Sequence, residues 1–332
     1  MKYIHLNFLK VFTAYRKFFC CLLFIISTFS CKETDLNFTE KLIKNFKTES
    51  INKDKIDWNN FEKLVLQKSR ISRDSAIILA LTLNNNPHSF YQKKNKILIG
   101  NFTSEENDSC LIGKKFDEKK FRDIGYIKVK TFYNRLEGHG DEAKEYVNTI
   151  VEKIKTNDKK KLSAWIIDLR GNRGGDMWPM LISLTPFFTN DVLGFFQIGN
   201  SKSKWLKIND EIYLNNDCQN DRISISPINY RLKNSGLKIA VLIDSRTGSS
   251  GEGVAIALKS LSNVKFFGTQ TYGFATANKP IKMGFNEYLV LTTGTMVDFS
   301  GKDYPKGVIP DYKVCSFKEL EKSVFNYLNS KI

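Results

Sequence analysis

A turn rich in glycine and serine carries the side chain best suited to act as a nucleophile, Ser249, within Thr247-Gly248-Ser249-Ser250-Gly251-Glu252. An apolar run over residues 240–243 precedes the turn, and apolar residues recur at helical spacing after it. This pattern predicts a buried strand, a tight turn and then a helix that begins at or just after Ser249. The unpaired N–H groups and the positive partial charge of a helix N-terminus could stabilise an oxyanion. The alternative is an ordinary helix cap with no chemical role.

A second glycine-rich turn, Asp168-Leu169-Arg170-Gly171-Asn172-Arg173-Gly174-Gly175-Asp176, follows another apolar run. Apolar residues from Met177 to Leu184 predict a helix directly after it. Glycine lets a backbone approach another backbone or a ligand closely. The spacing alone favours a plain strand-to-helix turn over an anion site, and it fits neither a Walker motif nor a dinucleotide fingerprint.

A serine nucleophile needs a base, and the chain contains only three histidines, His5, His88 and His139. His5 lies in the N-terminal segment. The asparagines and proline of Asn84-Asn85-Asn86-Pro87 end a helix and place His88 in a turn. His139 lies between two glycines, in what we interpret as a surface loop.

The elements that must position these residues form two parts. Residues 38–92 have a helical pattern, including a helix over residues 72–83, and residues 93–120 are polar and loop-rich. A strand over 124–129, an amphipathic helix over 143–154 and a buried strand over 164–167 then predict a crossover in a parallel sheet. Further strands are expected over residues 192–198, before a polar excursion, and over residues 264–267 and 288–292.

The first 31 residues have the three parts of a secretory signal: a basic start, an apolar segment over residues 18–26, and small residues before Cys31. The apolar segment is shorter than the roughly 20 residues of a membrane-spanning helix. Ser27-Thr28-Phe29-Ser30-Cys31 resembles a bacterial lipobox, although Thr28 replaces the usual aliphatic residue. We therefore expect a lipid on Cys31, with cleavage without lipidation as the alternative.

Composition excludes some classes of protein. The 332 residues are 42% apolar, which indicates a globular chain. The formal net charge of +16 comes from lysines interleaved with acidic residues, and no nucleic-acid motif is present. We therefore predict no nucleic-acid partner. The spacing of Cys110, Cys218 and Cys315 fits no metal motif, so we interpret them as structural or free thiols and predict no metal or cofactor.

Four motifs occur in the order known from one family of enzymes. They are Asp168-Leu169-Arg170-Gly171-Asn172-x-Gly-Gly, Thr247-Gly248-Ser249-Ser250-Gly251-Glu252, Gly268-x-x-Thr271-x-Gly273 and Gly307-Val308-x-Pro310-Asp311. Over residues 120–315 the chain resembles the C-terminal processing (tail-specific) serine peptidases and their tricorn-like relatives. The resemblance implies an α/β fold: a Clp protease/crotonase-like core of stacked β-β-α units, preceded by a small helical N-terminal region. It divides the chain into a signal over 1–31, a helical region and linker over 32–118 and a core over 119–332, without a PDZ module.

The same resemblance implies roles for individual residues. Ser249 matches the nucleophile, and the N–H groups of Gly175 and Ser250 match the oxyanion hole. Phe274 stands where processing peptidases carry a lysine base. Tricorn-like members use a histidine from a loop that resembles Pro87-His88-Ser89, which makes His88 the expected base. The third catalytic member would lie just before Gly307, where Tyr304 aligns and Asp303 lies beside it, and we take Asp303 as the candidate.

Together these features predict an exported, lipid-anchored serine endopeptidase of a bacterial cell envelope, which acts on peptides or proteins. One alternative is a catalytically inactive binding protein on the same scaffold. A crotonase-like acyl-CoA enzyme is least favoured, because export removes the chain from cytoplasmic acyl-CoA and crotonases lack the serine motif. The sequence leaves the oligomeric state, the substrate and the cleaved bond open.

Overall fold

The computed structural model describes residues 37–330 apart from residues 95, 103–110, 112–115, 117–122, 134–139, 160, 210, 217–218, 224 and 226–227. The chain divides into two compact units. Unit 1 comprises the residues up to Thr103 together with Lys279–Thr292, and unit 2 comprises Ser104–Asn278 with Thr293–Ile332. The helical N-terminal region is therefore completed by a segment that comes nearly 200 residues later in the chain.

Unit 1 contains a helix over residues 37–49, the short 3-10 helix η1 (Lys53–Lys55) and the helices α2 (Trp58–Ser69) and α3 (Arg73–Leu83). The side chains of Asp57 and Ser72 cap α2 and α3 by accepting hydrogen bonds from backbone N–H groups of the first turn. These helices pack on one face of a small antiparallel sheet built from β1 (Phe90–Lys93), β2 (Lys96–Ile99) and the first part of β12 (Glu287–Val297).

Unit 2 is built on a parallel sheet with the strand order β13-β10-β9-β4-β3. Its strands are β3 (Ile124–Lys128), β4 (Ala164–Asp168), β9 (Lys238–Ile243), β10 (Val264–Gly268) and β13 (Tyr312–Lys313). The helix α4 (Asp141–Asp158) connects β3 to β4, its parallel neighbour, as the hydrophobic periodicity predicts. The carboxyl ends of β4 and β9 therefore lie side by side and deliver both glycine-rich turns to the same edge of the sheet.

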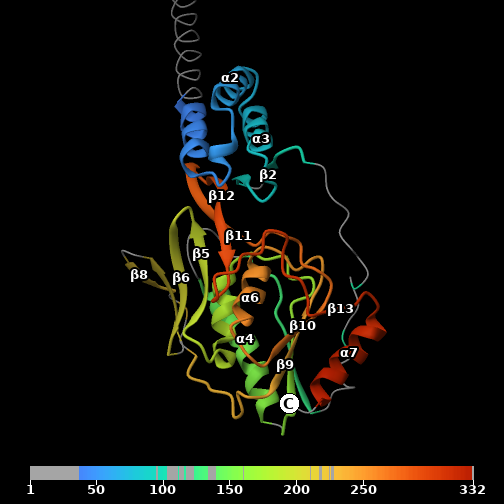
Figure 1. Cartoon of the computed structure of the whole chain (residues 1–332). Coiled ribbons are helices and arrows are strands. Elements are labelled where there is room, and N and C mark those ends of the chain that lie inside the picture. The colour runs from blue at the N-terminus through green and yellow to red at the C-terminus, as the bar shows by residue number, and fades with distance from the viewer. Residues whose placement is uncertain are drawn as a thin grey trace, which may run out of the picture. The chain divides into compact units, whose positions relative to one another are not determined.

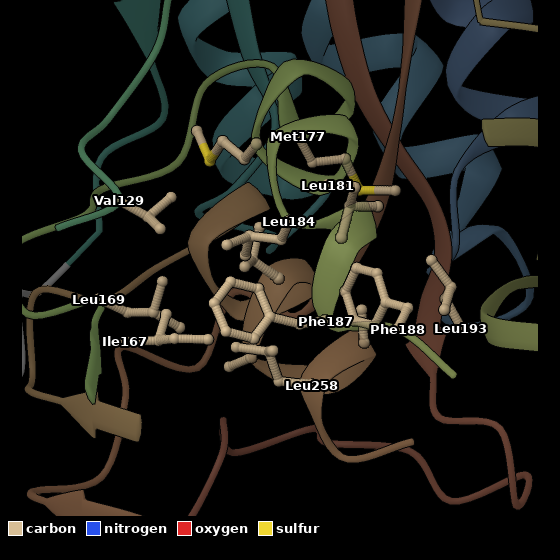
Figure 2. Packing of buried hydrophobic residues seen from close by; sticks show 14 of the residues in the cluster. Val129, Ile167, Leu169, Met177, Leu181, Leu184, Phe187, Phe188, Leu193 and Leu258 are labelled. Atoms are coloured by element: carbon tan, nitrogen blue, oxygen red, sulfur yellow. The ribbon is translucent and has the colours of Figure 1, made fainter. Parts of the chain in front are cut away.

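Helices cover both faces of this parallel sheet, which explains why its strands are almost wholly apolar (Figure 1). The helices α4, α5 (Met177–Ser183) and α6 (Ser250–Leu258) pack on one face, and α7 (Phe317–Asn329) packs on the other. Figure 2 shows the first of these layers, in which Phe187 and Leu184 lie among Ile167, Leu169 and Leu258. Every residue of α6 is buried, so the helix that follows Ser249 lies inside the core.

A second, antiparallel layer of unit 2 joins the last part of β12 to β5 (Val192–Ile198), which continues through β6 (Ser201–Ile208), β7 (Glu211–Asn216) and β8 (Gln219–Arg222). The remaining strand, β11 (Thr276–Gly284), pairs with β12. Both β11 and β12 cross the boundary between the units in the sequence.

The α/β class, the helical N-terminal region and the parallel sheet are as predicted. Several other strands were not predicted from the sequence. The prediction of a helical pattern up to residue 92 and of loops after it was wrong over residues 90–99, which form the hairpin of β1 and β2. The polar excursion after residue 198 contains β6, β7 and β8. The exposed residues of β6 include Lys202 and Lys204. The buried apolar side chains, Trp205 in β6 and Ile212 in β7, are too sparse to give a clear alternation.

Cys315 is disulfide-bonded. The cysteines were expected to be either structural or free thiols, and Cys315 is therefore structural. Cys31, Cys110 and Cys218 lie outside the described residues.

Candidate active site

Ser249 occupies the turn between β9 and α6 in a conformation that side chains rarely adopt. Its backbone has φ 53° and ψ −121°, although it is not a glycine. Such a conformation costs of the order of 1–3 kcal/mol, and it persists only where the surrounding structure imposes it. It places Ser249 at the N-cap position of the buried helix α6. The predicted strand, turn and helix around Ser249 are confirmed.

The glycine-rich turn after β4 packs directly against Ser249. Gly174 has φ +96°, and a methyl group placed on it would lie 2.8 Å from Cβ of Ser249 and 2.9 Å from the nitrogen of Ser250. The Ser250 hydroxyl donates a hydrogen bond of 2.6 Å to the carbonyl oxygen of Gly175. The structure therefore brings Ser249, Ser250 and Gly175 together, as the sequence predicted for the two turns.

Gly175 must be a glycine for reasons of both conformation and space. Its φ is +105°, and a methyl group there would lie 2.0 Å from the carbonyl oxygen of Phe132. Among the described residues, neither the N–H of Gly175 nor that of Ser250 donates to a protein acceptor. Two backbone donors close to Ser249 are thus left available at the N-terminal end of α6.

Two polar residues, Asn172 and Asp244, fix the position of one glycine turn relative to the other. Asn172 accepts from the N–H of Gly174 through Oδ1 (2.9 Å), and its backbone carbonyl accepts from the N–H of Gly248 (2.9 Å). Asp244, at the end of β9, accepts from the N–H of Gly171 (2.8 Å). Each residue joins the turn after β4 to the turn before α6, so the relative position of Ser249 and Gly175 is fixed by direct hydrogen bonds.

Glu252 is a fully buried carboxylate at the start of α6, and its motif alone did not predict a role for it. Its oxygens accept hydrogen bonds from the backbone N–H groups of Ser249 (2.9 Å), Gly273 (2.8 Å) and Phe274 (2.8 Å), and from the hydroxyl of Thr271 (2.5 Å). Burial raises the pKa of Glu252, and these hydrogen bonds oppose that rise. The spacing Ser-x-x-Glu, typical of a capping box, was the signal that could have singled it out.

His88 belongs to unit 1, where it lies in the predicted turn after α3. Asn86 fixes this turn, because its side-chain oxygen accepts from the N–H of His88 (3.1 Å) and from the hydroxyl of Thr292 (3.0 Å). Burial lowers the pKa of His88 to about 4. The imidazole is therefore neutral near pH 7, which is the form that can accept a proton.

The remaining candidates differ in how they are placed. The side chain of Asp303 is exposed, and its carboxylate makes no hydrogen bond or ion pair within the part of the chain that the structure describes. Tyr304 is buried and donates to Asp298 (2.6 Å). Phe274, at the position of the lysine base of processing peptidases, is half-buried, and its ring contacts that of Tyr272. His139 lies outside the described residues.

Lys128, a possible alternative base, is held in an ion pair. Its ammonium group lies 3.1 Å from the carboxylate of Asp168 and donates to the carbonyl oxygen of Arg170 (2.6 Å). Burial lowers the pKa of Lys128, and Asp168 opposes that effect only in part. While its ammonium group is protonated and paired with Asp168, Lys128 has no lone pair with which to accept a proton.

The described residues contain no group of three or more histidine, cysteine or acidic side chains that could hold a metal ion. Within the same residues, no helix combines the length and the apolar composition needed to cross a membrane.

Comparison with known proteins places these motifs in one family. Residues 123–314 match the model of peptidase family S41. The nisin-resistance protein of Lactococcus lactis subsp. lactis is 30% identical over 249 residues, which cover 73% of this chain and 74% of that protein. The carboxy-terminal processing protease CtpA of Bacillus subtilis (strain 168) is 24% identical over 240 residues, which cover 69% of this chain but only 45% of CtpA.

The fold agrees with a solved structure as well. A lipoprotein from Streptococcus agalactiae superposes with a TM-score of 0.68 at 20% sequence identity, and the match covers 90% of this chain and 97% of that one. The matched family region includes β3, β4, β9 and α6, and therefore both glycine turns and Ser249. On these grounds the chain belongs to peptidase family S41.

Proposed function

We propose that this protein is an exported, lipid-anchored serine endopeptidase in which Ser249 is the nucleophile and His88 the general base. Membership of family S41 supports a serine peptidase that acts on peptides or proteins. The observation that carries the assignment of Ser249 is its backbone at φ 53°, held at the start of a buried helix beside two available N–H donors. An ordinary helix cap does not need a strained backbone, because capping residues adopt extended conformations without cost.

In the proposed reaction, Oγ of Ser249 attacks the scissile carbonyl carbon while the imidazole of His88 accepts the hydroxyl proton. The N–H groups of Gly175 and Ser250 stabilise the resulting oxyanion, a contribution of roughly 3–4 kcal/mol for each donor. The tetrahedral intermediate collapses to an acyl-enzyme as His88 returns the proton to the leaving amine. Water then hydrolyses the ester by the same route in reverse and regenerates Ser249.

The test is covalent labelling with a fluorophosphonate, with the modified residue mapped by mass spectrometry. Ser249 should be labelled in the wild type, and Ser249→Ala should lose both the label and the turnover of peptides. Ser250→Ala is the matched control: it removes the hydroxyl that contacts Gly175 but keeps the proposed N–H donor, so it should retain labelling at Ser249. Labelling at Ser250 instead would contradict the assignment. Nisin belongs among the test substrates, because the relative at 30% identity is named for resistance to it.

His88→Ala should abolish turnover to the same extent as Ser249→Ala, and the double variant should be little worse than either, because members of one catalytic unit are not additive. Near-normal turnover by a folded His88→Ala variant would place the base elsewhere. The alternative function is that of an inactive binding protein on the same scaffold. A wild type that cleaves no peptide and resists the fluorophosphonate would favour that alternative.

A further inference from the structure

We propose that Glu252 is the positioning residue of this active site: its carboxylate holds Ser249 in its strained conformation and joins three separate segments of the chain around it. The proposal rests on the proposed function only in treating Ser249 as the nucleophile. It is a statement about the structure of the turn, and it can therefore be tested independently of peptide cleavage.

The carboxylate of Glu252 accepts hydrogen bonds from donors only. Glu252 is fully buried, and its two oxygens accept from three backbone N–H groups and one hydroxyl. The hydroxyl of Thr271 donates to Glu252 and at the same time accepts from the N–H of Val308 (2.7 Å). All four groups therefore act as donors toward the carboxylate. Only an ionised carboxylate can accept all of them, because a carboxamide or a protonated acid would turn a donor toward one of these partners.

The donors come from separate segments of the chain. Ser249 belongs to the turn before α6, and Gly273 and Phe274 belong to the loop after β10. Val308, whose N–H donates to the Thr271 hydroxyl, belongs to the loop before β13. A methyl group placed on Gly307 would lie 2.9 Å from Oε1 of Glu252 and 2.6 Å from the hydroxyl of Thr271. Three of the four sequence motifs therefore meet at one carboxylate. This explains why the motifs combine glycines and a threonine that have no chemical role of their own.

Glu252 also holds the backbone of Ser249 directly. Its N–H donates to Oε2 of Glu252, three residues later, at 2.9 Å. This bond fixes the peptide group between Gly248 and Ser249 on the side of the turn that faces the buried carboxylate. Without the acceptor, a positive φ for a serine loses a compensating interaction, and the backbone is expected to relax toward an extended cap. The neighbouring Ser250 N–H would move with it.

The experiment compares Glu252→Gln, which keeps the shape of the side chain, with a matched control, Asp158→Asn. Asp158 is also a buried carboxylate, and it accepts from the hydroxyl of Tyr230 (2.7 Å) and the N–H of Lys233 (2.9 Å). Two readouts are taken from each full-length variant: the rate of fluorophosphonate labelling, and the φ angle of Ser249 in a crystal structure. Melting temperatures identify any variant that does not fold.

We expect Glu252→Gln to fold, to lose its positive φ at Ser249 and to be labelled about 100-fold more slowly, the effect of misplacing one preorganised donor. Asp158→Asn should keep both the φ angle and the labelling rate. Thr271→Ser, which retains the hydroxyl, should keep the labelling rate and the φ angle of the wild type. Thr271→Val should change both in the same direction as Glu252→Gln.

A folded Glu252→Gln variant that retains φ near 53° at Ser249 overturns the proposal, whatever its labelling rate. If Glu252→Gln fails to fold, the structures of Thr271→Val and Thr271→Ser decide the question, because both leave the carboxylate in place and only Thr271→Val removes a donor. A φ near 53° at Ser249 in both variants would then overturn the proposal. If the wild type itself is not labelled, the proposed function fails, while the comparison of φ angles still decides whether Glu252 positions Ser249.

Discussion

At the scale of single residues, the candidate site is built from conformations that ordinary side chains avoid. Ser249, Gly174 and Gly175 all have positive φ, and a methyl group on Gly174 would lie 2.8 Å from Cβ of Ser249. Glycine adopts this region without cost, but serine does not. The Ser249 N–H donates to Glu252, whose carboxylate also accepts from Gly273 and Phe274, and these bonds offset the cost at Ser249.

The half-buried imidazole of His88 predicts an unusual pH dependence. Burial lowers its pKa to about 4, below the ordinary value of about 6.5. The neutral, proton-accepting form should therefore persist well below neutral pH, and the rate of fluorophosphonate labelling should fall to half near pH 4. Initial labelling rates measured from pH 3.5 to pH 8, with folding followed by circular dichroism, check this. A midpoint near 6.5 would show that the catalytic base is not His88.

The lowered pKa of His88 also makes the free energy of unfolding depend on pH. Between pH 6.5 and pH 4 the unfolded chain binds a proton at His88 that the folded chain does not bind. The free energy of unfolding should therefore decrease as the pH falls through this range, and His88→Ala should remove this part of the dependence.

At the scale of secondary structure, a charged cluster at the carboxyl ends of β3 and β4 supports the first glycine turn. The carboxylate of Asp168 is 1% exposed and accepts hydrogen bonds from Tyr126 (2.8 Å) and from the guanidinium of Arg170 (2.7 Å). Lys128 completes the cluster. The strand ends are thereby fixed before the chain enters the turn that carries Gly175.

Removal of this carboxylate should destabilise unit 2 strongly. Asp168→Asn leaves Arg170 and Lys128 without their counter-ion, and breaking a buried pair in this way costs about 3–5 kcal/mol. Urea unfolding at pH 7 measures the loss. Asp141→Asn is the matched control, because Asp141 pairs with Lys144 on the surface, where a pair contributes about 1 kcal/mol or less.

The pH dependence gives a second check on Asp168. Burial opposes its ionisation, but Arg170, Lys128 and Tyr126 outweigh that effect and hold the pKa below its ordinary value of 3.8. Its contribution to stability is thus fully present above pH 3.8 and is lost as the pH falls further. If Asp168→Asn unfolds at the same urea concentration as the wild type at pH 7, the cluster has no stabilising role.

At the scale of the whole molecule, the chain combines the core that matches peptidase family S41 with an N-terminal region that is completed by residues 279–292. In unit 1, Arg73 pairs with Glu287, and Tyr91 donates to the same carboxylate (2.8 Å). Lys279 pairs with Glu49 (2.9 Å). The late segment is therefore tied to the early helices by charge as well as by β pairing, and an N-terminal fragment that ends before residue 279 would lack part of its own core.

The predicted lipid on Cys31 belongs to this scale. Cys31→Ala should move the protein from the membrane fraction to the soluble fraction, because the mature chain would lose its acyl anchor. Ser30→Ala, which keeps a small residue before the cysteine, should remain in the membrane fraction. Fractionation with N-terminal mass analysis makes the measurement. Unchanged membrane association of Cys31→Ala with an intact N-terminus would indicate an uncleaved anchor instead.

Much of the fold could be predicted from local patterns. The apolar runs before Asp168 and Ser249 are long enough to identify buried strands, and the amphipathic period of α4 and the cap of α3 mark their helices. The short strands β1 and β2 and the polar strands β6 to β8 were not predicted. β1 and β2 have four residues each, and β1 is completed by pairing with the distant β12. The strands β6 to β8 pair with their neighbours in the sequence but contain too few core side chains to give a clear alternation. The register of a strand is set by its neighbours, which local composition does not encode.

The sequence by itself determined the order of the motifs, the family they indicate, and Ser249 and Gly175 as candidates for the site. Only the tertiary structure decided which hydrogen bonds join the two glycine turns, that residues 279–292 complete the N-terminal unit and that Glu252 is buried among four donors. The physical reason is the same in each case. A glutamate three residues after a serine is an ordinary surface pattern at a helix start, and it becomes a buried anchor only when distant loops bring N–H and hydroxyl groups to its oxygens.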